Sequence, residues 1–154
     1  MNLRTLVLGI TLIASPLSGW AQTSDNHYTE QERVNKQVVL DFYEKGINQK
    51  DADAAIALIG DEYIQHNPKA ADGKEGFRNF VAYLKKVHPN AHSEIKSVFV
   101  DGDHVILHVH AVRDPGTRGN AITDIFRLKN GKIVEHWDTT QAIPEESANE
   151  NGMF

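Results

Sequence analysis

Asp124-Ile-Phe-Arg-Leu-Lys-Asn-Gly-Lys-Ile-Val-Glu-His-Trp-Asp138 contains two runs of β-forming residues on either side of Asn130-Gly131. This dipeptide favours a type I′ turn, because both central positions of that turn need a positive φ. The stretch therefore predicts a β-hairpin with an apolar middle and a carboxylate on each strand near its open end. Ionisable groups beside an apolar wall are where pKa values are tuned for acid–base chemistry.

The register of this hairpin decides which side chains share a face. Alternation from a two-residue turn places Asp124 on an apolar face with Phe126, directly opposite Trp137. His136 and Asp138 then fall on the other face. A carboxylate on an apolar face is costly unless it is paired or used, so Asp124 is either a pocket acid or base or a structural carboxylate. A β-bulge near Trp137, or strong coiling, would bring Asp138 to the same face; without one we favour Asp124.

The N-terminus has the pattern of a secretory signal peptide. A short basic region at 1–5 precedes an apolar run at 6–14, and small residues lead to a cleavage point after Ala21. The apolar run is shorter than the roughly 20 residues that a bilayer span needs. We therefore expect residues 1–21 to be removed and the protein to be exported, periplasmic or secreted, with no membrane attachment after cleavage. The alternatives are an uncleaved anchor or a frayed N-terminus.

Charge and cysteine content narrow the class of protein further. The 154 residues include 16 Lys and Arg and 21 Asp and Glu, so acidic residues predominate, and the basic residues form no stripe along the chain. Nucleic acid is therefore not an expected partner. Because the chain has no cysteine, an exported form must be stabilised by its core alone, and its length is sufficient for one such domain.

Helix signals come before strand signals along the chain. Thr29 and Glu32 form a capping-box pattern that predicts a helix to about Asn48, and Asp51 can cap a second, short helix through Ile59. A third helix is predicted at 74–87, followed by strands at 92–100, 104–113, 120–129 and 132–140. This order predicts an α+β fold. We expect one domain at 22–143 and a polar C-terminal tail at 144–154.

The hairpin and this order of elements resemble the SnoaL-like polyketide cyclases, within the NTF2-like and ketosteroid-isomerase-like superfamily. The resemblance covers residues 30–140 and implies an NTF2-like cone, in which N-terminal helices pack on a curved antiparallel sheet and enclose a pocket. It also implies a catalytic carboxylate in the last strand, best matched by Asp138. The superfamily places an acidic base just after the second helix, where this chain has His66. Histidine also suits proton transfer near neutral pH.

Two histidines on one strand raise the question of a metal. His108 and His110 lie on the less apolar face of the strand at 104–113, so we expect them on the outer face, where they fit a dimer interface. The opposite assignment would bring them into the pocket with His66 and Asp124 as ligands for Zn²⁺ or Fe²⁺. His-x-His recurs by chance, so we predict no metal and keep His110 as a candidate binding residue.

The expected activity follows from the resemblance and the ionisable groups. We expect a cofactor-free acid–base enzyme, such as an aldol-type cyclase, isomerase or dehydratase, acting on a small apolar carbonyl compound. Asp138 or Asp124 would be the general base, and His66 or a tyrosine hydroxyl would steady the enolate. Tyr63, Phe126 and Trp137 are the candidate binding residues, although aromatic residues at such positions also form ordinary core.

A binding module is the alternative. The same cone could hold an apolar small molecule or a protein partner without turnover. A carboxylate inside the cone, within hydrogen-bond reach of His66 or a tyrosine, would favour catalysis, whereas carboxylates facing solvent would favour binding. In either case we expect a homodimer, because the resemblance implies pairing through the sheets.

Overall fold

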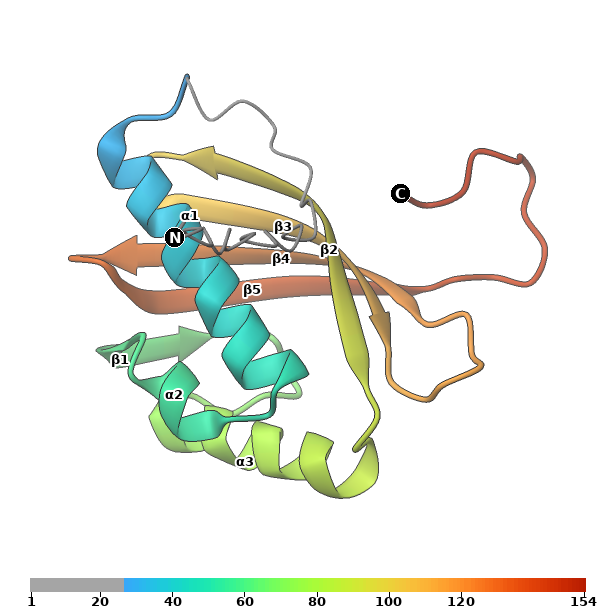
Figure 1. Cartoon of the computed structure of the whole chain (residues 1–154), viewed down its shortest axis with the longest axis horizontal. Helices are drawn as coiled ribbons and strands as arrows, with labels where there is room; N and C mark the ends of the chain where they lie inside the picture. The colour runs from blue at the N-terminus through green and yellow to red at the C-terminus, as the bar shows by residue number, and fades with distance from the viewer. Residues whose placement is uncertain (1–26) are drawn as a thin grey trace, which may run out of the picture.

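The computed structural model describes residues 27–154, and it confirms the predicted α+β fold (Figure 1). The signal peptide predicted for residues 1–21 lies outside the described residues. The elements, in chain order, are α1 (Glu30–Tyr43), η2 (Glu44–Asn48), α2 (Ala52–Ile56), β1 (Ile59–Gln65), α3 (Gly73–Val87), β2 (His92–Asp101), β3 (His104–Val112), β4 (Asn120–Lys129) and β5 (Lys132–Ala142). Within the described residues, no helix is long and apolar enough to span a membrane.

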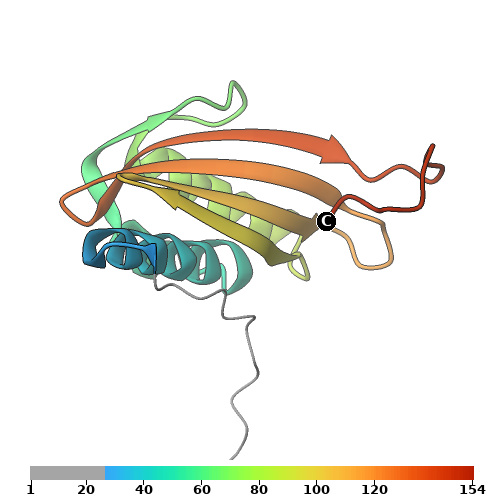
Figure 2. The same ribbon diagram turned by 90° about the horizontal axis from the view of Figure 1, so that it is seen from above.

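The strands form one sheet in the order β1-β5-β4-β3-β2. β1 pairs with β5 in parallel, and the other neighbouring strands are antiparallel. The sheet is curved, and the helices lie on one side of it (Figure 2). The second helix is shorter than predicted, because α2 ends at Ile56 and Ile59 already begins β1.

Local capping explains where α1 and α2 begin. The Thr29 hydroxyl accepts from the Glu32 backbone N–H at 3.2 Å, and the Glu32 carboxylate accepts from the Thr29 backbone N–H at 2.8 Å, which confirms the capping box. Asp51 caps α2 by accepting from the Ala54 backbone N–H at 3.0 Å. Each cap satisfies backbone donors that the first turn of a helix leaves unpaired.

The core lies between the helices and the concave face of the sheet. Val105, Leu107 and Val109 of β3 are fully buried there. The Phe42 ring of α1 lies 4.7 Å from the ring of Phe77 in α3, measured between centroids. Burying each such large apolar side chain contributes about 1.5–3 kcal/mol. The prediction that this face of β3 points inward is confirmed, and the histidines of β3 therefore lie on the outer face.

The β4–β5 hairpin differs from its predicted register. The turn forms as expected, with φ of 52° at Asn130 and 70° at Gly131. Beyond it the register shifts, because Leu128 pairs with Ile133 whereas Arg127 pairs with Glu135. Residue 134 is thus an extra residue in β5, which is the signature of a β-bulge.

The bulge shifts every pairing beyond it in the hairpin by one residue relative to the predicted register. Asp124 faces Asp138 and Phe126 faces His136, so the predicted pairing of Asp124 with Trp137 is wrong. A bulge near Trp137 is the alternative that the sequence leaves open, and the structure places it earlier, at Val134. Because successive side chains of a strand alternate between faces, one extra residue turns His136 and Asp138 inward together.

The C-terminal segment after β5 returns to the outer face of the sheet. The ring of Phe154 lies 5.1 Å from the ring of His108 and 5.0 Å from that of His110. The ammonium of Lys96 lies 5.7 Å from the centre of the same Phe154 ring. The last residue therefore covers part of the outer face of β2 and β3.

Candidate active site

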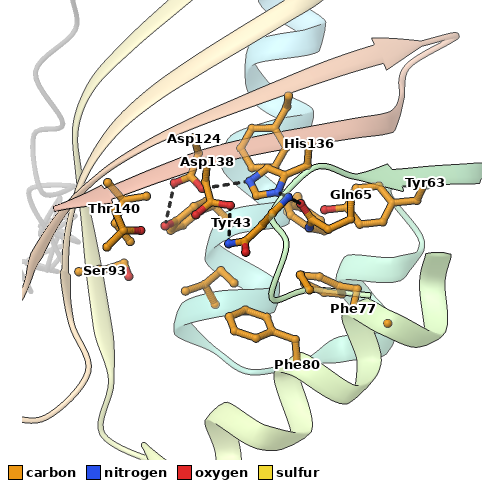
Figure 3. A pocket seen from close by; sticks show the side chains of 18 of the residues that line it. Tyr43, Tyr63, Gln65, Phe77, Phe80, Ser93, Asp124, His136, Asp138 and Thr140 are labelled. Atoms are coloured by element: carbon orange, nitrogen blue, oxygen red, sulfur yellow. Dashed lines mark hydrogen bonds and ion pairs between the residues drawn. The ribbon is translucent and has the colours of Figure 1, made fainter. Parts of the chain in front are cut away.

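A cavity of about 170 Å³ lies between the helices and the concave face of the sheet (Figure 3). Polar side chains of β4, β5 and the end of β1 form one wall, and aromatic side chains of α1 and α3 form the other. The residues that line the cavity include Tyr43, Tyr63, Gln65, Asn67, Phe77, Phe80, Arg113, Asp124, Phe126, His136 and Asp138. The cavity thus combines a polar wall with an apolar one, as small-molecule sites commonly do.

Asp124 is the most buried carboxylate of this wall, with 6% of the residue exposed. Its Oδ2 accepts a hydrogen bond from the Tyr43 hydroxyl at 3.3 Å. Its Oδ1 lies 3.0 Å from Nε2 of His136. Both oxygens therefore have partners, which offsets the cost of burying the carboxylate in an apolar setting.

His136 links Asp124 to the end of β1. Its Nδ1 lies 2.9 Å from Oε1 of Gln65. The same Oε1 accepts from the backbone N–H of Asn67 at 3.1 Å, which identifies it as the carbonyl oxygen of the amide. Because that oxygen can only accept, His136 Nδ1 must carry a proton. The 3.0 Å contact between His136 Nε2 and Asp124 is then a hydrogen bond when one of these two groups carries a further proton.

Asp138 is the second carboxylate of the cavity and lies directly across from Asp124 in the sheet. Its Oδ1 accepts from the Asn67 side-chain amide at 2.8 Å. Its Oδ2 has no hydrogen bond to any of the described residues. Asp138 therefore has a fixed orientation and one oxygen that can still accept a proton from a bound molecule.

The two tyrosines of the cavity are held in their neutral form. Burial raises the pKa of Tyr43 well above its ordinary value, and the charge of Asp124 raises it further, while a hydrogen bond with Ser93 opposes the rise. Burial also raises the pKa of Tyr63, with smaller contributions from the charges of Asp124 and Asp138. Both hydroxyls thus remain protonated near neutral pH, and that of Tyr43 donates to Asp124.

The structure brings some of the predicted site residues together. Asp124, Asp138, Tyr63 and Phe126 all line the cavity. His66 does not, because the alternation along β1 points Tyr63 and Gln65 inward and the next residue outward.

The remaining predicted residues lie on the outer face. His66 stacks on Trp137, with 4.5 Å between ring centroids and 1° between ring planes. Its Nε2 donates to Oε1 of Glu135 at 2.8 Å. Nε2 of His110 lies 2.8 Å from the backbone oxygen of Arg118. Within residues 27–154, no group of three or more His, Cys, Asp or Glu side chains is arranged to hold a metal ion.

Three residues of the polar wall were not among the predicted site residues. His136 was assigned to the outer face, because the sequence carries no mark of the bulge at Val134. Gln65 and Asn67 could have been found, because alternation from Tyr63 places them on the same face as that tyrosine. Their amides suit the role that they have here, which is to hold the ring of His136 and the carboxylate of Asp138.

A curved sheet that wraps its concave face around helices, with a cavity between the two layers, defines the NTF2-like class of folds. The model of the SnoaL-like domain family matches residues 39–136. This chain therefore belongs to the SnoaL-like family. A comparison with curated proteins gives no match.

Solved structures of the same fold agree with this assignment. A candidate polyketide cyclase from Bacillus cereus superimposes with a TM-score of 0.64 at 21% identity, over 75% of this chain and 80% of its own. A candidate SnoaL-like polyketide cyclase from Jannaschia sp. CCS1 gives 0.62 at 21%, over 73% and 89%. An NTF2-like protein of unknown function from Mesorhizobium loti gives 0.63 at 17%, over 75% and 98%. At these identities the likeness shows the fold and leaves the reaction to the site.

Proposed function

We propose that this protein is a cofactor-free acid–base enzyme that removes a proton from the carbon next to a carbonyl group of a small molecule. One observation carries the proposal: Asp124 and Asp138 face each other inside a largely apolar cavity, and only Asp138 keeps an oxygen without a partner among the described residues. A carboxylate inside the cone within reach of a tyrosine hydroxyl is the arrangement expected of an enzyme rather than of a binding module.

Asp138 is the general base in this proposal. Asn67 holds one of its oxygens at 2.8 Å, so the other can be aimed at a bound molecule. When Asp138 takes the α proton, the electrons of the C–H bond move into the carbonyl group and form an enolate. Asp124 is less suited to this step, because His136 and Tyr43 already engage both of its oxygens. A positioned base of this kind contributes about 10²–10⁴-fold to the rate.

Tyr43 is the donor to the developing enolate oxygen. Its raised pKa keeps the hydroxyl protonated, and its hydrogen bond to Asp124 is long at 3.3 Å. The hydroxyl can therefore turn to a substrate oxygen at little cost, since long hydrogen bonds are weak. A proton held between Asp124 and His136 can replace one that Tyr43 gives up. The enolate then regains a proton at another carbon in an isomerisation, or attacks a second carbonyl group in an aldol closure.

The size of the cavity limits the substrate. About 170 Å³ is close to the roughly 150 Å³ of an engineered cavity that holds benzene. Pockets for drug-sized molecules are larger, at about 300–1,000 Å³. The cavity therefore accommodates a group the size of a single ring.

Proton exchange tests this proposal without knowledge of the product. A panel of single-ring ketones and short oxo acids is incubated with the protein in D₂O, and loss of the α C–H signal is followed by NMR. We expect exchange with at least one compound, and a loss of about 10²-fold or more in Asp138→Asn. Glu135→Gln, on the outer face of the same strand, is the matched control and should exchange at the rate of the original protein. Binding of these compounds without exchange would instead support the binding module.

Export is a separate part of the proposal. It rests on the pattern of residues 1–21, with its basic start, apolar run and small residues before Ala21. Expression in a host with an envelope, followed by mass spectrometry of the mature chain, tests it. A mature N-terminus at Gln22 supports export, whereas an intact N-terminus in the cytosolic fraction contradicts it.

A further inference from the structure

One cationic side chain lines the cavity: Arg113 is the only Lys or Arg among the lining residues. It follows the last residue of β3, Val112, at the end of the strand. We propose that Arg113 binds a carboxylate of the substrate, so that the enzyme acts on small oxo acids rather than on neutral ketones. This inference rests on the proposed function, because it names the class of molecule that enters the same cavity.

The charge of Arg113 is not neutralised by the residues around it. Among the described residues, no carboxylate forms an ion pair with its guanidinium, and no side chain or backbone oxygen accepts a hydrogen bond from it. The adjacent carboxylate, Asp114, is bound instead to Nδ1 of His88 at 2.8 Å. A half-buried guanidinium without an anionic partner is unusual, since buried charges are normally paired. An anion entering the cavity would supply the missing partner.

Phe80 holds the guanidinium in place. The Arg113 guanidinium carbon lies 5.4 Å from the centre of the Phe80 ring, within the range of a cation–π contact. The N–H edges of the guanidinium remain available to a ligand, because no described residue accepts a hydrogen bond from them. Those edges match a carboxylate with two parallel hydrogen bonds, which a lysine ammonium cannot form.

The position of Arg113 is consistent with a substrate that spans the cavity. The positive charge of Arg113 reaches Tyr43, where it slightly opposes the rise in the pKa of that hydroxyl. A substrate carboxylate at Arg113 would direct the carbonyl group toward Tyr43 and the α carbon toward Asp138. When Asp124 and His136 hold one further proton between them, the cavity holds one negative charge, on Asp138, and one positive charge, on Arg113. The charge of Arg113 thus lets a second anion enter beside Asp138.

Calorimetric titration with benzoate and with its neutral isostere benzamide tests the inference, because both probes have the size of the cavity and neither can react. We expect the original protein to bind benzoate about tenfold or more tightly than benzamide, as a charge-assisted pair of hydrogen bonds requires. Arg113→Gln should abolish this preference and leave the affinity for benzamide unchanged. Arg118→Gln, in the same loop but outside the cavity lining, is the matched control and should keep the preference. Urea unfolding of each variant confirms that it is folded.

The outcomes separate this inference from the proposed function. Equal affinity for the two probes, no benzoate binding at about 1 mM, or a preference that survives in Arg113→Gln would overturn the role of Arg113. Exchange confined to neutral ketones would also overturn it, while leaving the acid–base proposal in place. Conversely, a benzoate preference that depends on Arg113, combined with no exchange of any compound in the panel, would contradict the proposed function alone.

Discussion

Strand β5 carries a histidine–carboxylate pair on each of its two faces, and the two pairs have nearly the same length. His136 lies 3.0 Å from Asp124 on the concave face, with side-chain exposures of 12% and 8%. His66 lies 2.8 Å from Glu135 on the outer face, with exposures of 39% and 15%. Because electrostatic interactions strengthen as water is excluded, the same chemical groups can form a reactive site on one face and a surface ion pair on the other.

The pair on the outer face also contacts two further side chains of that face. Arg127 donates from Nε to Glu135 at 2.6 Å, and the His66 ring stacks on Trp137. The hydrogen bond from His66, followed by that from Arg127, lowers the pKa of Glu135. The carboxylate is thus held in its charged form with both oxygens engaged. Asp138 differs from it in facing the cavity with one oxygen that no described residue engages.

Removing the bulge should have the largest effect, because the bulge decides which side chains of β5 point to the concave face and which to the outer face. Deletion of Val134 would shift the rest of β5 by one residue, which turns His136 and Asp138 outward and Trp137 inward. We expect a loss of about 5 kcal/mol in the free energy of unfolding, or failure to fold, measured by urea denaturation. Val134→Ala, which keeps the residue count, is the control and should lose far less. Equal small losses in both would show that the bulge does not set the register.

Removing the histidine from each histidine–carboxylate pair should lower the free energy of unfolding by different amounts. His136→Ala leaves Asp124 buried without its main partner, and we expect a loss of about 3 kcal/mol in the free energy of unfolding. His66→Ala leaves Glu135 with Arg127 at the surface, and the expected loss is below about 1 kcal/mol. Thermal or urea unfolding of the two variants measures both values. A similar loss in the two would mean that burial does not distinguish the faces.

Gly60 of β1 provides the room for the bulge. A Cβ added at Gly60 would lie 2.9 Å from Cγ1 of Val134, which is closer than real side chains approach. We expect Gly60→Ala to cost about 1–2 kcal/mol by overpacking. In the double variant with Val134→Ala, most of that loss should be recovered, because the clashing methyl group is gone. Costs that simply add in the double variant would argue against this contact.

The two faces should also lose stability at opposite ends of the pH scale. The folded-state pKa of Tyr43 is raised, so its contribution is complete below pH 10.0 and is lost as the pH rises further. The folded-state pKa of Glu135 is lowered, so its contribution is complete above pH 4.5 and is lost as the pH falls. Tyr43→Phe should make only the alkaline side of a stability profile less steep, since Tyr63 still contributes there, and Glu135→Gln should make only the acidic side less steep. Unfolding midpoints measured across pH check both, and a variant that alters the wrong side would refute the assignment.

Local signals predicted most of this fold. Asn130-Gly131 has the positive φ values of the expected turn, Thr29 and Glu32 form the capping box, and the inward face of β3 follows from alternation. Each of these depends on residues close together in the chain, so short-range physics is sufficient to predict them.

The site was less predictable, because it depends on contacts between distant segments. One extra residue at Val134 decides that His136 and Asp138 point into the cavity, and it fits there because β1 places Gly60 beside it. Alternation along a strand could not reveal this. Alternation does, however, assign His66 to the outer face once Tyr63 faces the pocket.

The nuclear Overhauser spectrum of the aromatic rings tests whether the bulge turns His136 and Asp138 into the cavity. The ring of His136 lies 4.7 Å from that of Phe126, and the ring of His66 lies 4.5 Å from that of Trp137. We expect cross-peaks between His136 and Phe126 and between His66 and Trp137. Cross-peaks between Trp137 and Phe126, with none from His136, would show the uninterrupted register and contradict a bulge at Val134.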